Sequence, residues 1–327
     1  MRYVDNNQIT DPHLNLALEE FLLRQSRTVE TLLLLYVNEP AVIVGRNQNV
    51  FEEVNPKFIK NENIHLIRRL SGGGTVYHDL GNLNYSFITE GQTNLHKFER
   101  VTEPIIRVLR DLGVAAEFRA RSDIVVGQKK ISGNAQYASR GRMLSHGTLL
   151  FDSDLEQLNR AIKPGKAEIE SRAVPSVRSS VGNIRDLSPL TWTVDDLAQA
   201  LLNGILGPGE TPVYRLSNED WRHIRLIAEE RYKSWEWNIA RSPKFNITRR
   251  GHISGGTIEV FMAIEKGLIK RVTLQGTPFA EQAGHRLAPV LENVRYDPVD
   301  LAKALHPLEN ERLFAWLSKE AFIDLLY

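Results

Sequence analysis

The sequence predicts a mixed α/β fold of the α+β class, in which a large sheet domain precedes a small α/β domain. The chain has 327 residues, more than one hydrophobic core usually holds. Short apolar runs rich in leucine and β-branched residues alternate with helical patterns up to about residue 235. A fresh series of strand and helix patterns begins near Asn246. We therefore expect one domain at 1–245, with its core at about 27–212, and a second at 246–327.

The composition is that of an ordinary globular protein. Hydrophobic residues make up 42% of the chain and charged residues 25%, far from the composition of disordered chains. Lys+Arg 41 against Asp+Glu 40 leaves a net charge of +1, so no global field attracts nucleic acid or a membrane. The N-terminus has no signal-peptide pattern, and the apolar run Leu32–Val37 is far below the ~20 residues that span a bilayer. We expect a cytoplasmic protein with no nucleic-acid or membrane partner.

An amphipathic helix and a series of strands are expected in the first half of the chain. Asp11 and Pro12 suit the N-cap and first position of a helix, and apolar side chains recur on one face over residues 14–21. Two adjacent strands are expected over 31–37 and 41–44, because the residues between them have turn composition. Further strands are expected over 64–67, 84–88, 116–119, 123–126 and 146–151.

Helices and one long loop are expected in the rest of the chain. A helix over 101–112 ends at Gly113, a residue typical of helix C-termini. Residues 163–183 are polar and aperiodic, and a loop of that length is more often a functional flap than a plain connection. Capping signals begin helices at Thr193 and near Ser217. The remaining pattern predicts a hairpin over 257–274 that turns at 265–267, and helices over 279–292, 298–305 and 311–326.

The most unusual stretch runs from Arg68 to Asn82 and reads RRLSGGGTVYHDLGN. Glycines let backbone N–H groups converge on a ligand, and an arginine beside them offers a planar fork for phosphate. The stretch is no Walker loop, because no Gly-Lys-Ser/Thr follows, and its spacing is not that of dinucleotide sites. Three glycines alone are more typical of a flexible turn, so an anion-binding loop is a hypothesis at this point.

This stretch resembles the lipoate-binding motif of the lipoate-protein ligase A family. The resemblance continues in order through DPHLNLALEEFLL, PAVIVGRNQN, KISGNAQYASRGRMLSHGTLLFD, SVRSSVGNI and WEWNIARSPKF. The segment from Asn246 is similar to the accessory C-terminal domain of bacterial members. The resemblance implies a biotin/lipoate ligase-like catalytic domain, with a mixed β-sheet and flanking helices, followed by that accessory domain.

The resemblance also implies an activity and its partners. Members activate lipoate with ATP to lipoyl-AMP and pyrophosphate, and then transfer the lipoyl group to a lysine of an apo carrier. The implied carriers are lipoyl domains of 2-oxoacid dehydrogenase E2 subunits and the glycine cleavage H protein. ATP and Mg²⁺ are the implied co-substrate and ion, with no tightly bound prosthetic group, and the chain is expected to be a monomer. The sequence does not rank the carriers, or lipoate against octanoate.

Lys130 is the catalytic residue that the resemblance implies, in contact with the acyl oxygen and the α-phosphate of lipoyl-AMP. A charge pair ~4 Å apart is worth ~1 kcal/mol in water and ~4 kcal/mol at an effective dielectric of ~20. A lysine shielded from water therefore stabilises a nearby negative charge more strongly. Without the motif, a lysine beside Lys129 is typical of a solvated strand end, and His78 of a hydrogen-bonded structural histidine. The implied ATP and lipoyl-AMP contacts are Arg69, Gly74, Thr75, Val76, Tyr77, His78, Lys130 and Arg178. The implied lipoate contacts are Ser71, Gly72, Gly73, Lys130, His146 and Gly147.

Two further features bear on the nucleotide. Asp123 is a candidate Mg²⁺ ligand, since hard oxygen ligands suit that ion, although a surface aspartate explains it as well. Residues 163–183 resemble the adenylate-binding loop, which closes over the nucleotide and excludes water. Relatives often carry a basic residue where this chain has Ser180. We therefore expect an altered nucleotide affinity and a retained reaction.

Other activities fit the residues less well. The chain has no cysteine, which excludes disulfides, zinc thiolates and acyltransfer through a cysteine thioester. A lipoyltransferase that uses preformed lipoyl-AMP remains the alternative. A biotin ligase is disfavoured because its Gly-Arg-Gly-Arg type loop is absent. A catalytically silent regulator is disfavoured by Lys130 and Arg69, and by the lack of a helix-turn-helix or basic stripe.

Overall fold

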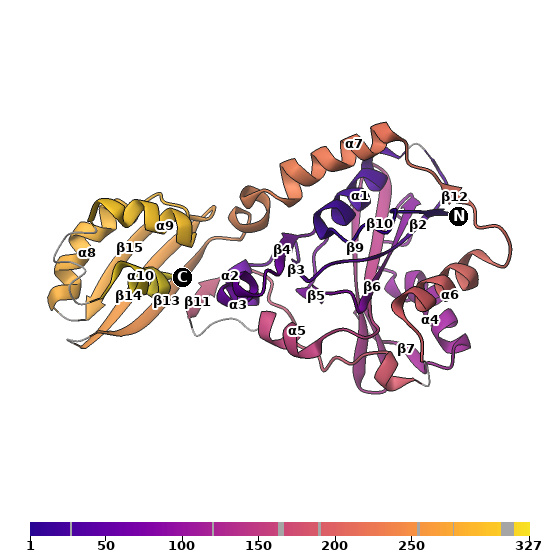
Figure 1. The fold of residues 1–327 in the computed structure, drawn as a ribbon, viewed down its shortest axis with the longest axis horizontal. Helices are drawn as coiled ribbons and strands as arrows, with labels where there is room; N and C mark the ends of the chain where they lie inside the picture. The colour runs from indigo at the N-terminus through magenta and orange to yellow at the C-terminus, as the bar shows by residue number, and fades with distance from the viewer. Residues whose placement is uncertain are drawn as a thin grey trace. The chain divides into compact units, whose positions relative to one another are not determined.

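The computed structural model consists of two compact units, each built from separate segments of the chain (Figure 1). It describes residues 1–26, 28–119, 121–162, 167–188, 191–253, 256–276, 278–308 and 317–327. The first unit comprises residues 1–46, 58–162 and 176–234, and the second comprises 47–57, 163–175 and 235–327. The mixed α/β class expected from the sequence is confirmed. The contiguous domain boundary at 245/246 stays a prediction, because the compact units add two internal segments to the C-terminal part.

An eight-stranded mixed sheet forms the frame of the first unit, in the order β12-β1-β2-β6-β10-β9-β8-β7. β1 pairs in parallel with β2 and β12, and the other neighbours are antiparallel. The strands are β1 (Arg2–Val4), β2 (Leu32–Val37), β6 (Asn82–Glu90), β7 (Ala116–Arg119), β8 (Asp123–Val126), β9 (Lys129–Ser139), β10 (Arg142–Leu150) and β12 (Val213–Tyr214).

A separate three-stranded sheet carries β4 (His65–Arg68), β3 (Ala41–Val44) and β5 (Val76–His78) in that order. The expectation that 31–37 and 41–44 are adjacent strands is therefore wrong, because β2 and β3 belong to different sheets. The connecting residue Asn38 is fully buried and redirects the chain. Its side chain accepts from Asn15 Nδ2 at 2.8 Å and lies 2.9 Å from Nδ1 of His78.

Helix caps read from the sequence agree with the structure. Asp11 accepts hydrogen bonds from the first-turn amides of α1, and Thr193 and Ser217 form capping boxes at α6 and α7. In the part of the chain that the structure describes, every helix is too short or too polar to cross a bilayer. The helices are α1 (Pro12–Gln25), α2 (Val50–Glu53), α3 (Pro56–Asn61), α4 (Phe98–Asp111), α5 (Leu155–Ala161), α6 (Val194–Leu206) and α7 (Asn218–Ile227), with π-helical turns at Ala228–Tyr232 and Glu236–Ala240 and 3-10 turns at Arg185–Leu187 and His306–Leu308.

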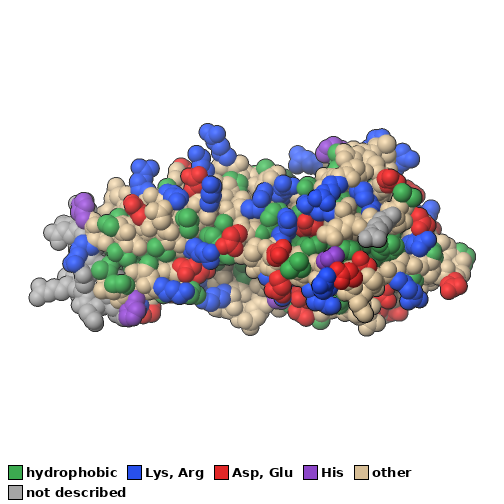
Figure 2. All heavy atoms as spheres, turned by 90° about the horizontal axis from the view of Figure 1, so that it is seen from above, with side chains coloured by type: hydrophobic (Ala, Val, Ile, Leu, Met, Phe, Trp, Pro, Cys, Tyr) green, Lys and Arg blue, Asp and Glu red, His purple; other side chains and the backbone are tan. Residues whose placement is uncertain are grey.

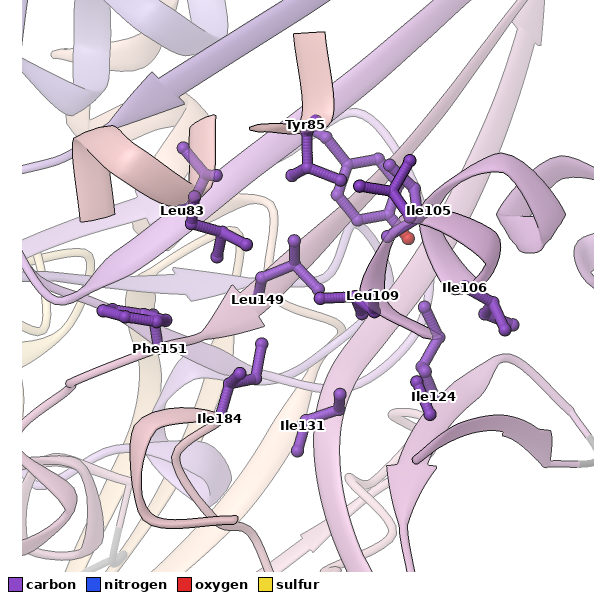
Figure 3. Close-up of a cluster of buried hydrophobic side chains, with 14 of the residues drawn as sticks. Leu83, Tyr85, Ile105, Ile106, Leu109, Ile124, Ile131, Leu149, Phe151 and Ile184 are labelled. Atoms are coloured by element: carbon purple, nitrogen blue, oxygen red, sulfur yellow. The ribbon is translucent and has the colours of Figure 1, made fainter. Parts of the chain in front are cut away.

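The core of the first unit lies where α4 covers the large sheet (Figure 3). Ile105 and Leu109 of α4 meet Leu83 of β6, Leu149 of β10 and Ile131 of β9. All five side chains are at most 1% exposed, and burying each contributes about 1.5–3 kcal/mol. This core fixes β9 and β10, the strands that carry the candidate site residues.

The second unit is a four-stranded antiparallel sheet, in the order β11-β13-β14-β15, together with the helices α8, α9 and α10 among the described residues. The predicted hairpin turn is confirmed, since Lys266 and Gly267 both have positive φ, at 52° and 70°. Part of the helix expected over 311–326, namely 311–316, lies outside the described residues. The elements are β11 (Glu168–Ser171), β13 (Phe245–Ile253), β14 (Gly256–Glu265), β15 (Leu268–Gly276), α8 (Pro278–Leu291), α9 (Pro298–Leu305) and α10 (Lys319–Leu326).

Two internal segments complete the second unit. Phe51 of α2 packs against Phe245 and Tyr296, with ring centroids 5.4 and 4.9 Å apart. β11 pairs with β13 from Glu168↔Thr248 onward, so the expectation of a continuous loop over 163–183 is wrong at 168–171. A four-residue edge strand that alternates polar and half-buried side chains is too short to stand out in the sequence.

Replacing Leu149 with Ala should lower the free energy of unfolding by about 2–5 kcal/mol, because the side chain is fully buried and leaves a cavity. Urea unfolding followed by fluorescence measures the change. Leu80→Ala is the matched control, since Leu80 is 60% exposed and its loss should matter little. Equal shifts in the two variants would contradict this assignment of the core.

Candidate active site

A cavity of about 160 Å³ lies in the first unit beside the end of the glycine motif. One wall is formed by Thr75, Val76 and Tyr77, and another by Lys130, Ser132 and Gly133 of β9. A third wall is formed by Ser176–Ser179 and Val181. The cavity thus brings together five residues expected at the nucleotide from separate parts of the sequence, namely Thr75, Val76, Tyr77, Lys130 and Arg178.

Lys130 presents a partly shielded ammonium group to this cavity. Its Nζ lies 2.8 Å from Oδ1 of Asp123, and the two side chains are 24% and 22% exposed. The backbone of Lys130 is held by the segment 180–182. Lys130 N donates to Ser180 O at 2.9 Å, and Gly182 N donates to Lys130 O at 3.0 Å. A Cβ on Gly133 would stand 3.1 Å from Lys130 Nζ, so the glycine leaves room for the ammonium group.

The neighbouring Lys129 lies on the other side of the same strand. Successive residues of a strand point to opposite faces, and Lys129 Nζ donates to Oγ of Ser180 at 2.9 Å. Neither Lys129 nor Ser180 lines the cavity. Ser180 therefore makes its side-chain contact outside the cavity. The altered nucleotide affinity expected from Ser180 stays a prediction.

Arg69 holds the glycine loop from within the protein. Its guanidinium is buried and donates to Ser71 Oγ at 3.0 Å, Ile43 O at 3.1 Å, Gly72 O at 2.6 Å and Gly74 O at 2.8 Å. Burial lowers the pKa of Arg69 to about 10, so the group remains a cation at neutral pH. These donors face the loop carbonyls, and a direct contact between Arg69 and phosphate stays a prediction.

Gly73 is required by the shape of this loop. Its φ is +90°, a conformation that disfavours other residues, and an added Cβ would stand 3.0 Å from Nη2 of Arg69. The loop then leads into Thr75, whose N–H donates to Ser176 Oγ at 2.9 Å. The glycine motif is therefore tied to Arg69 on one side and to the 176–181 segment on the other.

Beneath the loop lies a buried hydrogen-bond chain that includes a residue missed in the sequence. His146 Nε2 is 2.7 Å from Ser71 Oγ, and His146 Nδ1 is 3.0 Å from Oε2 of Glu19. A carboxylate only accepts, so Nδ1 of His146 carries a proton directed at Glu19. Glu19 is 2% exposed and also accepts from Tyr36 at 3.1 Å. Every residue from Asn15 to Leu23 of α1 is buried, so helical periodicity in the sequence does not single out Glu19.

His78 is a buried neutral histidine close to the same chain. Its Nδ1 accepts from Nδ2 of Asn38 at 2.9 Å, and its Nε2 has no hydrogen-bond partner among the described residues. Burial, and then the charges of Arg69 and His146, lower the pKa of His78 to about 3. The residue therefore offers an N–H donor in the interior at neutral pH.

Gly147 permits close packing in β10. An added Cβ would stand 2.2 Å from Oδ1 of Asn134 and 2.7 Å from the ring of Tyr85, which are themselves hydrogen-bonded. None of the expected lipoate residues except Lys130 lines the cavity. Ser71 and His146 join the buried chain, whereas a Cβ on Gly72 would meet no atom within 4 Å.

Comparisons with known proteins agree over the whole length of the chain. The family model of the lipoyl protein ligase A/B catalytic domain matches residues 11–206, and that of the bacterial lipoate protein ligase C-terminus matches residues 242–326. Lipoate-protein ligase LplJ of Bacillus subtilis (strain 168) is 41% identical over 331 residues, covering 100% of both chains.

Solved structures show the same similarity. A bipartite lipoate protein ligase from Thermoplasma acidophilum, studied with its E2 lipoyl domain, has a TM-score of 0.61 at 26% identity, covering 72% of this chain and 95% of that one. Lipoate-protein ligase A bound with ATP has a TM-score of 0.60 at 26% identity, covering 72% of this chain and 97% of that one.

The matching family model and the solved ligases of similar fold define a catalytic domain of the lipoyl ligase class. The two family models account for both parts of the chain. The chain belongs to the lipoate-protein ligase A family.

Acid should destabilise the protein through His78. The unfolded chain binds a proton at this residue below pH ~6.5, whereas the folded chain resists it until pH about 3. The contribution of neutral His78 to the free energy of unfolding is complete above pH ~6.5. It is lost as the pH falls, by up to about 1.4 kcal/mol per pH unit. In His78→Gln, urea midpoints between about pH 7 and pH 5 should fall less steeply than in the wild type. Identical pH slopes would contradict a buried neutral His78.

Proposed function

We propose that this chain is an ATP-dependent lipoate-protein ligase that works in lipoate salvage. It joins lipoate to AMP with release of pyrophosphate, and then transfers the lipoyl group to a specific lysine of an apo carrier. The observation that carries the proposal is Lys130, whose ammonium group faces a cavity walled by Thr75–Tyr77 and by Ser176–Ser179. Family membership supports the same reaction.

Activation needs charge neutralisation more than covalent chemistry. A lipoate carboxylate oxygen bonds to the α-phosphorus of ATP, and the bond to pyrophosphate breaks. Lys130 neutralises the negative charge shared by the carboxylate and the α-phosphate in this step. Asp123 keeps the ammonium group in place before the nucleotide arrives, at an Nζ–Oδ1 distance of 2.8 Å. The lysine then exchanges this partner for the substrate.

Backbone and loop groups complete the nucleotide site in this proposal. The backbone of residues 74–77 provides contacts with the adenylate once the Thr75 N–H exchanges Ser176 Oγ for the ligand. Arg69 keeps that backbone in place through the carbonyls of Gly72 and Gly74. Arg178 projects from the segment that closes one wall of the cavity. Shielding by this segment protects the mixed anhydride from water and strengthens the charge interactions.

Asp123 also fits a magnesium ion bound with ATP. Among the described residues, no three acidic or histidine side chains gather closely enough to enclose a metal. One carboxylate, completed by phosphate oxygens and water, is a common way to hold Mg²⁺ beside ATP. The ion would supply positive charge to the phosphates when bound, and Asp123 is the residue that would hold it.

Transfer follows when a carrier lysine enters as a free amine. Its nitrogen bonds to the lipoyl carbonyl carbon, AMP leaves with the electron pair of the anhydride bond, and the amine loses a proton. Lipoyl domains of E2 subunits and the glycine cleavage H protein are the proposed carriers; a solved relative was studied with an E2 lipoyl domain. A monomeric, cytoplasmic enzyme is part of the proposal.

The alternative, a transferase that only uses preformed lipoyl-AMP, is not favoured, because curated relatives along the full chain are named ligases. Lipoate-dependent exchange between ATP and pyrophosphate separates the two. The ligase catalyses the exchange with lipoate alone, whereas a transferase that cannot make the adenylate does not. Mass spectrometry of an apo lipoyl domain incubated with ATP, Mg²⁺ and lipoate or octanoate tests the second step.

Lys130→Ala should lower the adenylation rate by roughly 10² to 10³, as expected on deleting one preorganised charge-stabilising donor. Lys129→Ala is the matched control, because Lys129 contacts Ser180 outside the cavity and its loss should change the rate little. The rate is measured by lipoate-dependent ATP–pyrophosphate exchange. A Lys130→Ala enzyme as fast as the Lys129→Ala control would show that the wrong lysine has been assigned.

A further inference from the structure

A basic surface hollow lies apart from the residues of the cavity described above. Lys and Arg side chains are interspersed with Asp and Glu over the face shown in Figure 2, in keeping with a net charge of +1. A hollow of about 540 Å³ is richer in cations, because Lys97, Arg100 and Arg121 line it together with one carboxylate, Glu99. It is lined by His96, Lys97, Phe98, Glu99, Arg100, Phe118 and Arg121, which we call the basic hollow.

The cations of the basic hollow have no carboxylate partners. Lys97, Arg100 and Arg121 are exposed, and none of them forms an ion pair within 4.0 Å with any described residue. Other arginines of the same unit, such as Arg185 and Arg222, do form such pairs. Three unpaired like charges repel one another, and an incoming anionic surface relieves that repulsion.

The backbone around the basic hollow is held in two uncommon conformations. His96 and Arg121 have φ values of +64° and +83°, which are unfavourable for residues other than glycine. The turn at His96 is pinned to β9, because its N–H donates to Oε1 of Gln136 at 2.6 Å and Gln136 Nε2 donates to Asn94 O at 3.2 Å. The turn that precedes Lys97 and Arg100 is therefore held in place by β9.

The basic hollow is close along the chain to the catalytic lysine. Arg121 is two residues from Asp123, a separation of at most ~7 Å along an extended chain, and Asp123 pairs with Lys130. The intervening Ser122 is fixed to β9, since its carbonyl accepts from the backbone N–H of Asn134 at 3.1 Å. An acidic side chain one or two residues from an acceptor lysine spans a similar distance. The acidic side chain of such a carrier segment can therefore reach the basic hollow while its lysine reaches Lys130.

We propose that the basic hollow docks the carrier protein by acidic side chains that flank its acceptor lysine, and so delivers that lysine to Lys130. The inference rests on the proposed function, which requires a protein lysine as the acceptor. Phe98 and Phe118, both half-buried, provide an apolar floor beneath the charges. Charge complementarity of this kind acts chiefly on the rate of encounter and on partner choice.

The test uses the full chain with Lys97→Glu and Arg100→Glu combined. Lys60→Glu combined with Arg225→Glu is the control, because both residues are exposed in the same unit, lie outside the hollow and give the same change of charge. The acceptor is an apo lipoyl domain with acidic residues beside its lysine. Three quantities are measured at low and high ionic strength: kcat/KM for the carrier, affinity for the carrier by calorimetry, and lipoate-dependent ATP–pyrophosphate exchange.

We expect kcat/KM for the carrier to fall at least about tenfold at low salt in the hollow variant and little in the control. The difference should shrink at high salt, and exchange should be unchanged. A carrier whose flanking acids are replaced by lysines should recover transfer with the hollow variant. Equal transfer by the two variants, or loss of exchange together with transfer, would overturn the docking role. If the wild type shows no exchange, the ligase proposal fails, and the calorimetric comparison still decides the docking surface.

Discussion

The buried guanidinium of Arg69 is the interaction on which the site depends. A buried charge is costly unless its donors are satisfied, and here four hydrogen bonds to a serine hydroxyl and three carbonyls offset that cost. Two of those carbonyls belong to Gly72 and Gly74. The loop keeps its shape because releasing it would leave an unpaired cation in the interior.

Ser71 extends this constraint into the helix at the start of the chain. Through Ser71, His146 and Glu19, the loop is linked to β10 and α1, which lie far apart in sequence. The buried chain is saturated on every side that the structure describes, whereas the neighbouring cavity presents Lys130 to solvent-accessible space. Arg69, Ser71, His146 and Glu19 thus hold one another in position in the interior, whereas Lys130 lines the cavity.

Local signals predicted the helices and the hairpin, because caps and turns depend on a few neighbouring residues. Asp11, Thr193 and the Lys266-Gly267 turn are of this kind. β9 was not predicted, since its lysines, glycine and small polar residues give no apolar period. The motif placed Lys130 at the cavity, but Glu19 acquires its role from a histidine 127 residues away, which no local pattern reveals.

The second unit draws on segments that are synthesised at very different times. Phe51 leaves the ribosome nearly two hundred residues before Phe245 exists, and Tyr296 follows later still. An apolar aromatic side chain therefore waits without its native partners while most of the polypeptide is made. Chain elongation proceeds at about 5–20 residues per second. The Phe51 side chain therefore stays exposed for many seconds, long enough for chaperones to bind it.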